Sequence, residues 1–240
     1  MSHSNIHFSP DGTSISERTV GELVAERPSR SRIFQNLGID FCCKGGQTLK
    51  TACLNKGIPE ADMIARLEQE LAGNPARQEN PATLPAHELC SYIVETHHGY
   101  LRRELPRILA MSTRVAQVHG DHTPSLLHVA EVFDGLKQEL ESHIMKEETI
   151  LFPVISAISK GESQSMPIDG PVSCMLKEHD DAGAALARLR ELTGGYQCPK
   201  DACNTYRALF SGLQELEEDL HRHIHLENSV LFPMALTMAK

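Results

Sequence analysis

LESHIMKEETILFP (residues 140–153) and LHRHIHLENSVLFP (residues 220–233) are two versions of one segment, 80 positions apart. They agree at Leu, His, Ile, Glu, Leu, Phe and Pro. A weaker pair lies upstream of each copy, where His98 in YIVETHHGYL and His179 in CMLKEHDDAG are 81 positions apart. A repeat of this kind predicts two copies of a helix pair, and therefore four long helices packed as a bundle.

Apolar residues recur at spacings of three and four along each expected helix, which is the pattern of a helix with one buried face. Polar residues interrupt these apolar stripes at positions that the pattern assigns to the core. Each of the four stripes contains a histidine, and two of them also contain a glutamate. The six residues are His98, His143, Glu147, His179, His223 and Glu227.

The two His-x-x-x-Glu pairs, at 143/147 and 223/227, predict a metal site. Four residues span about one helical turn, so both side chains of a pair project from the same face. Burying unpaired carboxylates is costly, whereas a cation would compensate both of them together with four imidazoles. Nitrogen and carboxylate ligands in a helical bundle favour iron or manganese over a structural zinc. Two carboxylates at symmetric positions can bridge two metals that the histidines cap, with the assignment of each histidine left open.

The bulk composition fits an all-α protein and excludes several functions. Aromatic residues make up 5% of the 240 residues, with no Trp, which suits helix packing better than a sheet sandwich. A net charge of −9 disfavours binding to nucleic acid or an anionic membrane. No run approaches the roughly 18 apolar residues of a membrane span. Seven cysteines at irregular spacing, without an export signal, predict free thiols in the cytoplasm.

The chain before the bundle has the features of a small helical module. We expect a disordered tail over 1–15, a helical Cys-Cys domain over 16–73, a proline-rich linker over 74–86 and the bundle over 87–240. Start and stop signals such as Thr19, Gly38 and Gly57 place short helices in the module. They are expected at 20–26, 29–37, 48–56 and 60–73. A sharp turn at 40–46 contains Cys42 and Cys43.

Residues 87–240 resemble a hemerythrin-like domain, which implies a non-haem di-iron four-helix bundle. The oxygen-carrying hemerythrins usually have His-x-x-x-His on the third helix and His-x-x-x-x-Asp on the fourth. This chain departs at both places, because Gly183 lies four residues after His179 and the last pair is His223/Glu227. With one histidine fewer than those carriers, the site leaves more positions for water, an oxo bridge or a small gas molecule. The departure argues against reversible oxygen carriage.

TVGELVAERPSRSRIFQNLGIDFCCKGG (19–46) resembles the short domain that precedes such a bundle in the iron–sulfur cluster repair di-iron proteins. The resemblance implies two iron ions, bridged by carboxylates and an oxo group and held by the six residues named above. It selects His98 over His97, because His98 stands eight residues before Pro106. It also implies that Glu139 and Glu178 are carboxylates near the metals, with second-shell or proton-handling roles.

The adjacent Cys42 and Cys43 have several interpretations: an incidental pair, a strained vicinal disulfide, or thiols that transfer iron. The family context favours the last, since thiolates are soft ligands suited to iron. We expect Lys44 and exposed loop amides to lower a thiol pKa here. The remaining cysteines read as ordinary thiols, and His221 and His225 flank the fourth stripe as solvent-facing residues. Those cysteines are Cys53, Cys90, Cys174, Cys198 and Cys203.

The resemblance implies a cytoplasmic stress protein that repairs iron–sulfur clusters damaged by nitric oxide or oxidants, with a labile di-iron centre as iron source. Its partners would be the damaged proteins and nitric oxide or oxygen, and analogy adds a homodimer through the small module. Reduction of nitric oxide would also make it an oxidoreductase. Two rival functions remain: a module that stores or senses these gases, and a di-iron oxidase. The missing histidine and the Cys-Cys module favour repair over storage.

Overall fold

The computed structural model describes residues 14–73, 80–162 and 167–239. Within these ranges the chain is helical, with one isolated bridge between Thr19 and Thr48, so the predicted all-α class is confirmed. The described residues form two compact units, one from those within 1–84 together with 224–233, and one from those within 85–223 together with 234–239. The predicted tail falls mainly on residues 1–13, and the first half of the predicted linker on 74–79, both outside the described residues. None of the described helices is long and apolar enough to cross a membrane.

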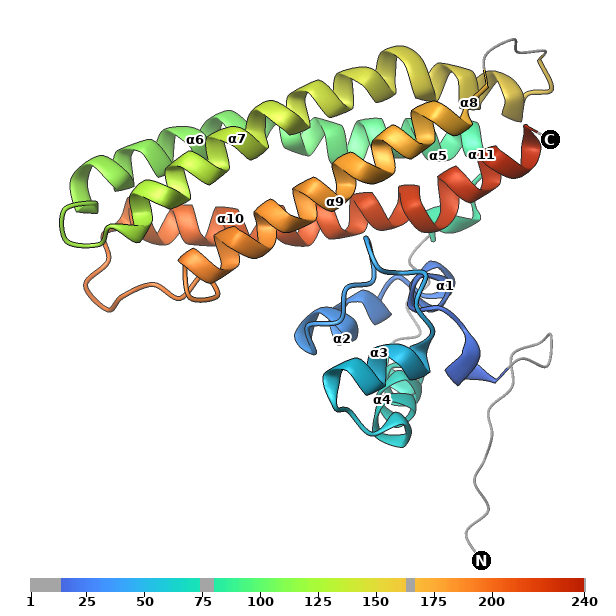
Figure 1. Cartoon of the computed structure of the whole chain (residues 1–240), viewed down its shortest axis with the longest axis horizontal. Helices are drawn as coiled ribbons and strands as arrows, with labels where there is room; N and C mark the ends of the chain where they lie inside the picture. The colour runs from blue at the N-terminus through green and yellow to red at the C-terminus, as the bar shows by residue number, and fades with distance from the viewer. Residues whose placement is uncertain (1–13, 74–79, 163–166, 240) are drawn as a thin grey trace, which may run out of the picture. The chain divides into compact units, whose positions relative to one another are not determined.

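Four long helices form the bundle, and Figure 1 shows them running alongside one another. Three of them are continuous helices in which a short segment changes pitch. The first consists of α5 (Ala86–Ile93), η3 (Val94–His98) and α6 (Gly99–His119). The second consists of α7 (Ser125–Lys146), η4 (Glu147–Leu151) and α8 (Phe152–Ser159). The third is α9 (Asp169–Leu192), and the fourth consists of α10 (Asn204–Leu226), η5 (Glu227–Leu231) and α11 (Phe232–Met238).

The change of pitch in three helices occurs at the predicted ligands. Segments η3, η4 and η5 are π-helical turns; the first ends at His98, and the others begin at Glu147 and Glu227. A π-turn inserts one extra residue and so rotates the side chains that follow, a feature common at functional sites. Pro153 and Pro233 follow two of these turns and cannot donate the backbone hydrogen bond of an uninterrupted α-helix. The sequence repeat therefore has a counterpart in backbone geometry.

The bundle core consists of the apolar stripes predicted from the sequence. Leu101, Phe133, Leu189 and Leu216 come from the four helices in turn, and none exposes any surface. Full burial of one such side chain stabilises the fold by about 1.5–3 kcal/mol. These residues belong to one apolar cluster, drawn mainly from positions 101–115, 126–144, 182–189 and 206–220 of the four helices, which fixes the helices against one another.

The N-terminal segment forms the short helices that its capping signals predict. The four predicted helices are α1 (Val20–Glu26), α2 (Arg30–Asn36), α3 (Leu49–Lys56) and α4 (Glu60–Gly73). Two short 3-10 turns that were not predicted, η1 (Ile15–Glu17) and η2 (Pro81–Thr83), lie before and after them in the sequence. Thr19 and Glu22 form a reciprocal capping box at the start of α1. Gly38 and Gly57 end their helices at φ 64°, a left-handed conformation that glycine adopts without strain. The apolar core of this unit also includes Ile224 of the fourth helix.

Candidate metal centre

The structure brings together all six residues that the sequence places on the apolar stripes. Each is buried, with between 0% and 4% of its surface exposed, although imidazole and carboxylate groups normally favour water. They come from all four helices: one histidine from each, and a glutamate at the start of η4 and of η5. The residues are His98, His143, Glu147, His179, His223 and Glu227.

The donor atoms fall into two overlapping groups of four. One group contains His98 and His223, the other His143 and His179, and both contain Glu147 and Glu227. Within each group the candidate ligand atoms lie within 4.8 Å of one another. The histidine pairs, which the sequence left open, are thereby defined. The donor chemistry suits a hard-to-borderline cation such as iron at each group.

The imidazole nitrogens converge closely within each pair. The Nε2 atoms of His98 and His223 are 3.3 Å apart, and those of His143 and His179 are 3.2 Å apart. Glu147 Oε2 lies between the two pairs, 3.3 Å from His98 Nε2 and 3.4 Å from His143 Nε2. Within each pair one Nε2–H can donate to the other ring, and a cation in place of that proton would accept the lone pairs of both imidazoles and of the carboxylate. The geometry therefore fits metal binding.

Two glutamates orient the ligand histidines from behind. Glu148 Oε1 is 2.7 Å from His98 Nδ1, and Glu178 Oε2 is 2.9 Å from His143 Nδ1. A histidine that donates its Nδ1–H to a carboxylate keeps the lone pair of Nε2 directed at the metal and becomes a more basic ligand. Both glutamates continue to a cation, Glu148 to Arg102 and Glu178 to Lys146. The two histidines thus have matching outer partners.

These outer carboxylates are held in the ionised state. Burial opposes ionisation of Glu148, but hydrogen bonds from Arg102 and His98 outweigh it and hold its pKa below the usual value. Glu178 behaves in the same way, because Lys146 and His143 outweigh the effect of burial on its pKa. A negative charge therefore lies directly behind one histidine of each pair.

Sequence reasoning identified one of these two outer carboxylates. Glu178 lies near the metal ligands, as the resemblance implied, whereas Glu148 was not predicted. The second copy of the repeat has Asn228 at the equivalent place, so the repeat provided no signal for Glu148. Glu139 is exposed, and among the described residues no hydrogen bond or ion pair links it to the six donors. Its second-shell role stays a prediction.

His97 lies next to the site but outside both donor groups. Its Nδ1 is 3.1 Å from both carboxylate oxygens of the buried Asp219. Its ring stacks parallel to that of His223, with centroids 5.3 Å apart and 2° between the planes. His97 thus packs against a ligand candidate and pairs with an acid of its own, while His98 points into the donor cluster.

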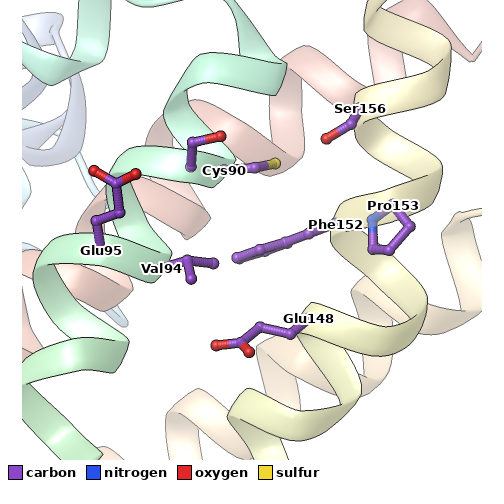
Figure 2. Close-up of a pocket in the computed structure, with 8 residues that line it drawn as sticks. Cys90, Val94, Glu95, Glu148, Phe152, Pro153 and Ser156 are labelled. Atoms are coloured by element: carbon purple, nitrogen blue, oxygen red, sulfur yellow. The ribbon is translucent and has the colours of Figure 1, made fainter.

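A pocket of about 380 Å³ adjoins the His98 side of the site. Figure 2 shows it between the first helix, with Cys90, Val94 and Glu95, and the second, with Glu148 and Phe152. Ser91, Pro153 and Ser156 complete the lining. Two of these residues touch His98 itself: Glu148 accepts its Nδ1–H, and the Phe152 ring stacks on it with centroids 5.7 Å apart. One layer of side chains therefore separates the pocket from the donors.

The Cys42-Cys43 loop differs from the expectation in its electrostatics. Both residues are free thiols, with the two Sγ atoms 3.8 Å apart, so the vicinal disulfide is not formed. The hydrogen bond to Cys43, burial and the nearby Asp40 raise the pKa of the Cys42 thiol well above its usual range. For Cys42 the expected lowering is wrong, and the amides of Cys42 and Cys43 donate to Asp40 Oδ1. Lys44 is exposed.

The expectation that His225 faces solvent is also wrong. Only 4% of its surface is exposed, and its ring meets that of Phe41 edge-on at 5.8 Å between centroids. Burial lowers its pKa to about 4, so the ring is neutral. Residues 224–233 belong to the same compact unit as the described residues of the N-terminal segment. Packing in that unit buries the His225 face of the fourth helix, which helical periodicity alone assigns to water.

Four helices around a buried histidine–glutamate cluster define a cation-binding bundle of the hemerythrin class. The sequence model of the hemerythrin HHE cation binding domain matches residues 91–235. That of the domain of unknown function DUF542 matches residues 16–71.

The curated relatives match almost the whole chain. The iron–sulfur cluster repair protein YtfE of Pectobacterium atrosepticum is 39% identical over 220 residues, which cover 92% of this chain and 97% of that protein. Proteins of the same name from Edwardsiella ictaluri and Escherichia coli O1:K1 are 39% and 37% identical with the same coverage. The chain belongs to the family of YtfE-type iron–sulfur cluster repair proteins, as the sequence resemblance implied.

Proposed function

We propose that this chain repairs damaged iron–sulfur clusters, the activity for which its relatives are named, by donating iron from a two-iron centre. The observation that carries the proposal is the pair of four-donor groups that share Glu147 and Glu227. His98 and His223 would hold one ion, and His143 and His179 the other. The two shared carboxylates, together with an oxo group, would bridge them.

The donor set favours iron as the bound metal. All six donors are imidazole nitrogens or carboxylate oxygens, a set typical of non-haem iron in helical bundles, and none is a thiolate. Bound ferrous iron would supply redox chemistry and affinity for nitric oxide. The protein residues exclude water by packing, orient the two histidine pairs, and place the charges of Glu148 and Glu178 behind them.

The same donor count supports a releasable iron. Each ion would receive two histidines of its own and two carboxylates that it shares with its neighbour. The remaining coordination positions are left to water, the bridging oxygen or a small gas molecule, and such ligands exchange more readily than protein side chains. A site intended for permanent retention would supply further protein donors.

Cys42 and Cys43 are the proposed acceptors of that iron, or the groups that hold the damaged cluster during transfer. Their sulfur atoms lie 3.8 Å apart, and Cys43 is partly accessible. We assign the activity to the cytoplasm, a compartment that keeps thiols reduced, and to conditions of nitrosative or oxidative stress. Reduction of nitric oxide at the centre and a homodimer through the small module belong to the same proposal.

The test is reactivation of an iron–sulfur enzyme that nitric oxide has damaged. Reduced, iron-loaded protein should restore its activity while losing iron of its own. A Cys42→Ser/Cys43→Ser variant should keep its iron and restore activity more slowly. The matched control is Cys198→Ser/Cys203→Ser, two thiols in the segment before the fourth helix, which should behave as wild type. Equal rates for all three proteins would refute the role of Cys42 and Cys43.

A gas-binding function is the second candidate. The pocket beside His98 favours it, since Val94 and Phe152 give it an apolar wall suited to a small neutral molecule. A protein of this kind would bind nitric oxide in its reduced form, keep its iron and leave the damaged enzyme inactive. That outcome would replace the repair proposal.

A further inference from the structure

A second cluster of metal-binding groups lies in the turn between α2 and α3. Asp40, Cys42 and Cys43 each offer one ligand atom, and these atoms lie within 4.8 Å of one another. Cys42 Sγ is 3.2 Å from Asp40 Oδ1 and 3.8 Å from Cys43 Sγ. The cluster combines two sulfurs with a carboxylate, whereas the six donors of the bundle contain no sulfur.

The turn that carries this cluster is held in place by the backbone around it. Asp40 Oδ1 accepts hydrogen bonds from the amides of Cys42, at 3.0 Å, and Cys43, at 2.9 Å. The Gly21 amide donates to Gly45 O at 2.8 Å, and the Asn228 side chain donates to Cys42 O at 3.2 Å. The donors therefore need little rearrangement to receive an ion.

Two glycines make this tight arrangement possible. A Cβ on Gly45 would lie 2.5 Å from Phe41 O, and a Cβ on Gly21 would lie 3.2 Å from Gly45 O. A larger residue at Gly45 would clash within the turn itself, and one at Gly21 would press on Gly45 O and, more closely, on Ser229 Oγ at 2.5 Å. The turn is thus built for close approach, which a loop that only connects two helices does not require.

The Asx turn alone does not account for the two sulfurs. A carboxylate that accepts two backbone amides explains why an aspartate stands at position 40. The Cys42 thiol also donates to Asp40 Oδ1 at 3.2 Å, and its sulfur lies 3.8 Å from that of Cys43, so two sulfurs and one carboxylate converge. Convergence of three anionic or ionisable groups is a feature that a cation would explain.

The geometry points to a mononuclear metal site in which Asp40, Cys42 and Cys43 bind one thiophilic divalent cation. Two thiolates and one carboxylate provide three ligands, a set that suits zinc or ferrous iron, with a further position open. That ferrous iron is the physiological ion, received from the bundle, rests on the proposed function. The open position is where a sulfur atom of a client protein would coordinate the same ion.

Binding at this site is an exchange of protons for metal. The two S–H groups lose their protons to solvent as two metal–sulfur bonds form, and the carboxylate of Asp40 adds a metal–oxygen bond. No electrons are transferred. Two thiolates beside a carboxylate repel one another, and a bound cation compensates their negative charge.

Cobalt(II) is a suitable probe, because thiolate ligation gives it an intense near-ultraviolet charge-transfer band that nitrogen and oxygen ligands do not give. Titration of iron-loaded, full-length protein without oxygen should produce this band and saturate at one cobalt per chain. Cys42→Ser/Cys43→Ser should abolish the band. Cys203→Ser, which removes an exposed thiol that lies 3.5 Å from His119 Nε2, should retain it.

Asp40→Asn separates the ligand role from the structural role. The asparagine side-chain oxygen can still accept the two amides and keep the turn, but it lacks the negative charge. We expect cobalt affinity to fall by about tenfold or more, as for loss of a supporting group at a metal site. Unchanged affinity would overturn the assignment of Asp40, and a saturated titration without the charge-transfer band would overturn the site itself.

Two further measurements keep the inference falsifiable. If circular dichroism shows that Asp40→Asn has lost its helices, the single variant Cys43→Ser provides the test instead. Cys43 is partly exposed, and its replacement should weaken the same cobalt band. Failure of the proposed function is recognised separately by the reactivation assay. A protein that binds cobalt as described but never reactivates the damaged enzyme has this metal site without iron donation.

Discussion

Replacement of Glu148 by Gln tests whether the outer carboxylates control metal affinity. Glu148 Oε1 lies 2.7 Å from His98 Nδ1, and the same carboxylate pairs with Arg102 at 2.6 Å. Glutamine keeps the shape and an oxygen that accepts the Nδ1–H, but it removes the negative charge. The variant therefore changes the strength of one hydrogen bond while His98 keeps its place.

The size of the effect follows from the kind of bond that is lost. A hydrogen bond to a charged group contributes about 1.5–3 kcal/mol and a neutral one about 1 kcal/mol, so Glu148→Gln should cost about 1 kcal/mol. That is about a fivefold loss of affinity for the ion at His98 and His223. Glu148→Ala removes the acceptor altogether, and we expect a loss of about 10–100-fold. Arg102 is half exposed, so its broken ion pair adds little.

The assay is the rate at which reduced, iron-loaded protein loses ferrous iron to a coloured chelator. Glu148→Gln should speed release of the ion at the first histidine pair and leave the second unchanged. Glu178→Gln, the matched variant behind His143, should do the converse. Glu139→Gln, at an exposed position, tests the second-shell role that the resemblance implies: release at the wild-type rate would argue against that role.

Two results would refute this reasoning. Release from Glu148→Gln at the wild-type rate, while Glu178→Gln accelerates it, would mean that Glu148 does not support His98. An effect of Glu139→Gln as large as that of Glu148→Gln would mean that direct contact with a ligand histidine does not set the rate, and it would support the second-shell role implied for Glu139 by resemblance. Thermal unfolding of each variant would verify that all three share the wild-type fold.

The remaining predictions concern the shared ligands and the buried thiol. Glu227→Ala removes a donor from both groups and should abolish most bound iron, whereas His223→Ala should spare the ion at His143 and His179. Metal analysis after anaerobic purification distinguishes the two variants. Full iron content in Glu227→Ala would contradict the sharing of Glu227 by the two groups. Because the Cys42 pKa is raised, iodoacetamide should alkylate it more slowly than the exposed Cys203 at neutral pH. The native state also holds this proton to higher pH than the unfolded chain, so the stability difference between wild type and Cys42→Ser should shrink as pH rises above about 8.5, the ordinary thiol pKa. Equal alkylation rates for Cys42 and Cys203 would refute the raised pKa of Cys42.

Much of the site was predictable because helical periodicity relates residues that are close in sequence. The repeat and its apolar stripes identified four helices, and each polar residue on a stripe had to be buried. Capping signals such as Thr19 and Gly57 act within one turn, so the short N-terminal helices were also predictable. The resemblance to known families then added the iron and the repair function to a pattern that already indicated a metal.

Contacts between different helices were not predictable in the same way. Glu148 lies one position after a ligand, and only the π-turn at η4 together with the packing of the first helix brings its carboxylate to His98. Glu139 follows the helical spacing toward His143 but is exposed. For Glu148 the reason is the change of pitch that begins at Glu147, which a fixed period of 3.6 residues cannot anticipate, whereas Glu139 lies before that turn in regular helix.

By itself, the sequence determined the all-α class, the four-helix bundle, its six buried donors and the short capped helices before it, because periodicity and capping are local properties of the chain. Only the tertiary structure decided which histidines pair, which carboxylates stand behind them, that His225 is buried against Phe41, and that Asp40 takes the amides expected to favour a thiolate. Each of these depends on which surfaces of distant segments meet. Burial and charge at a side chain are set by those neighbours, and a pattern along one helix does not contain them.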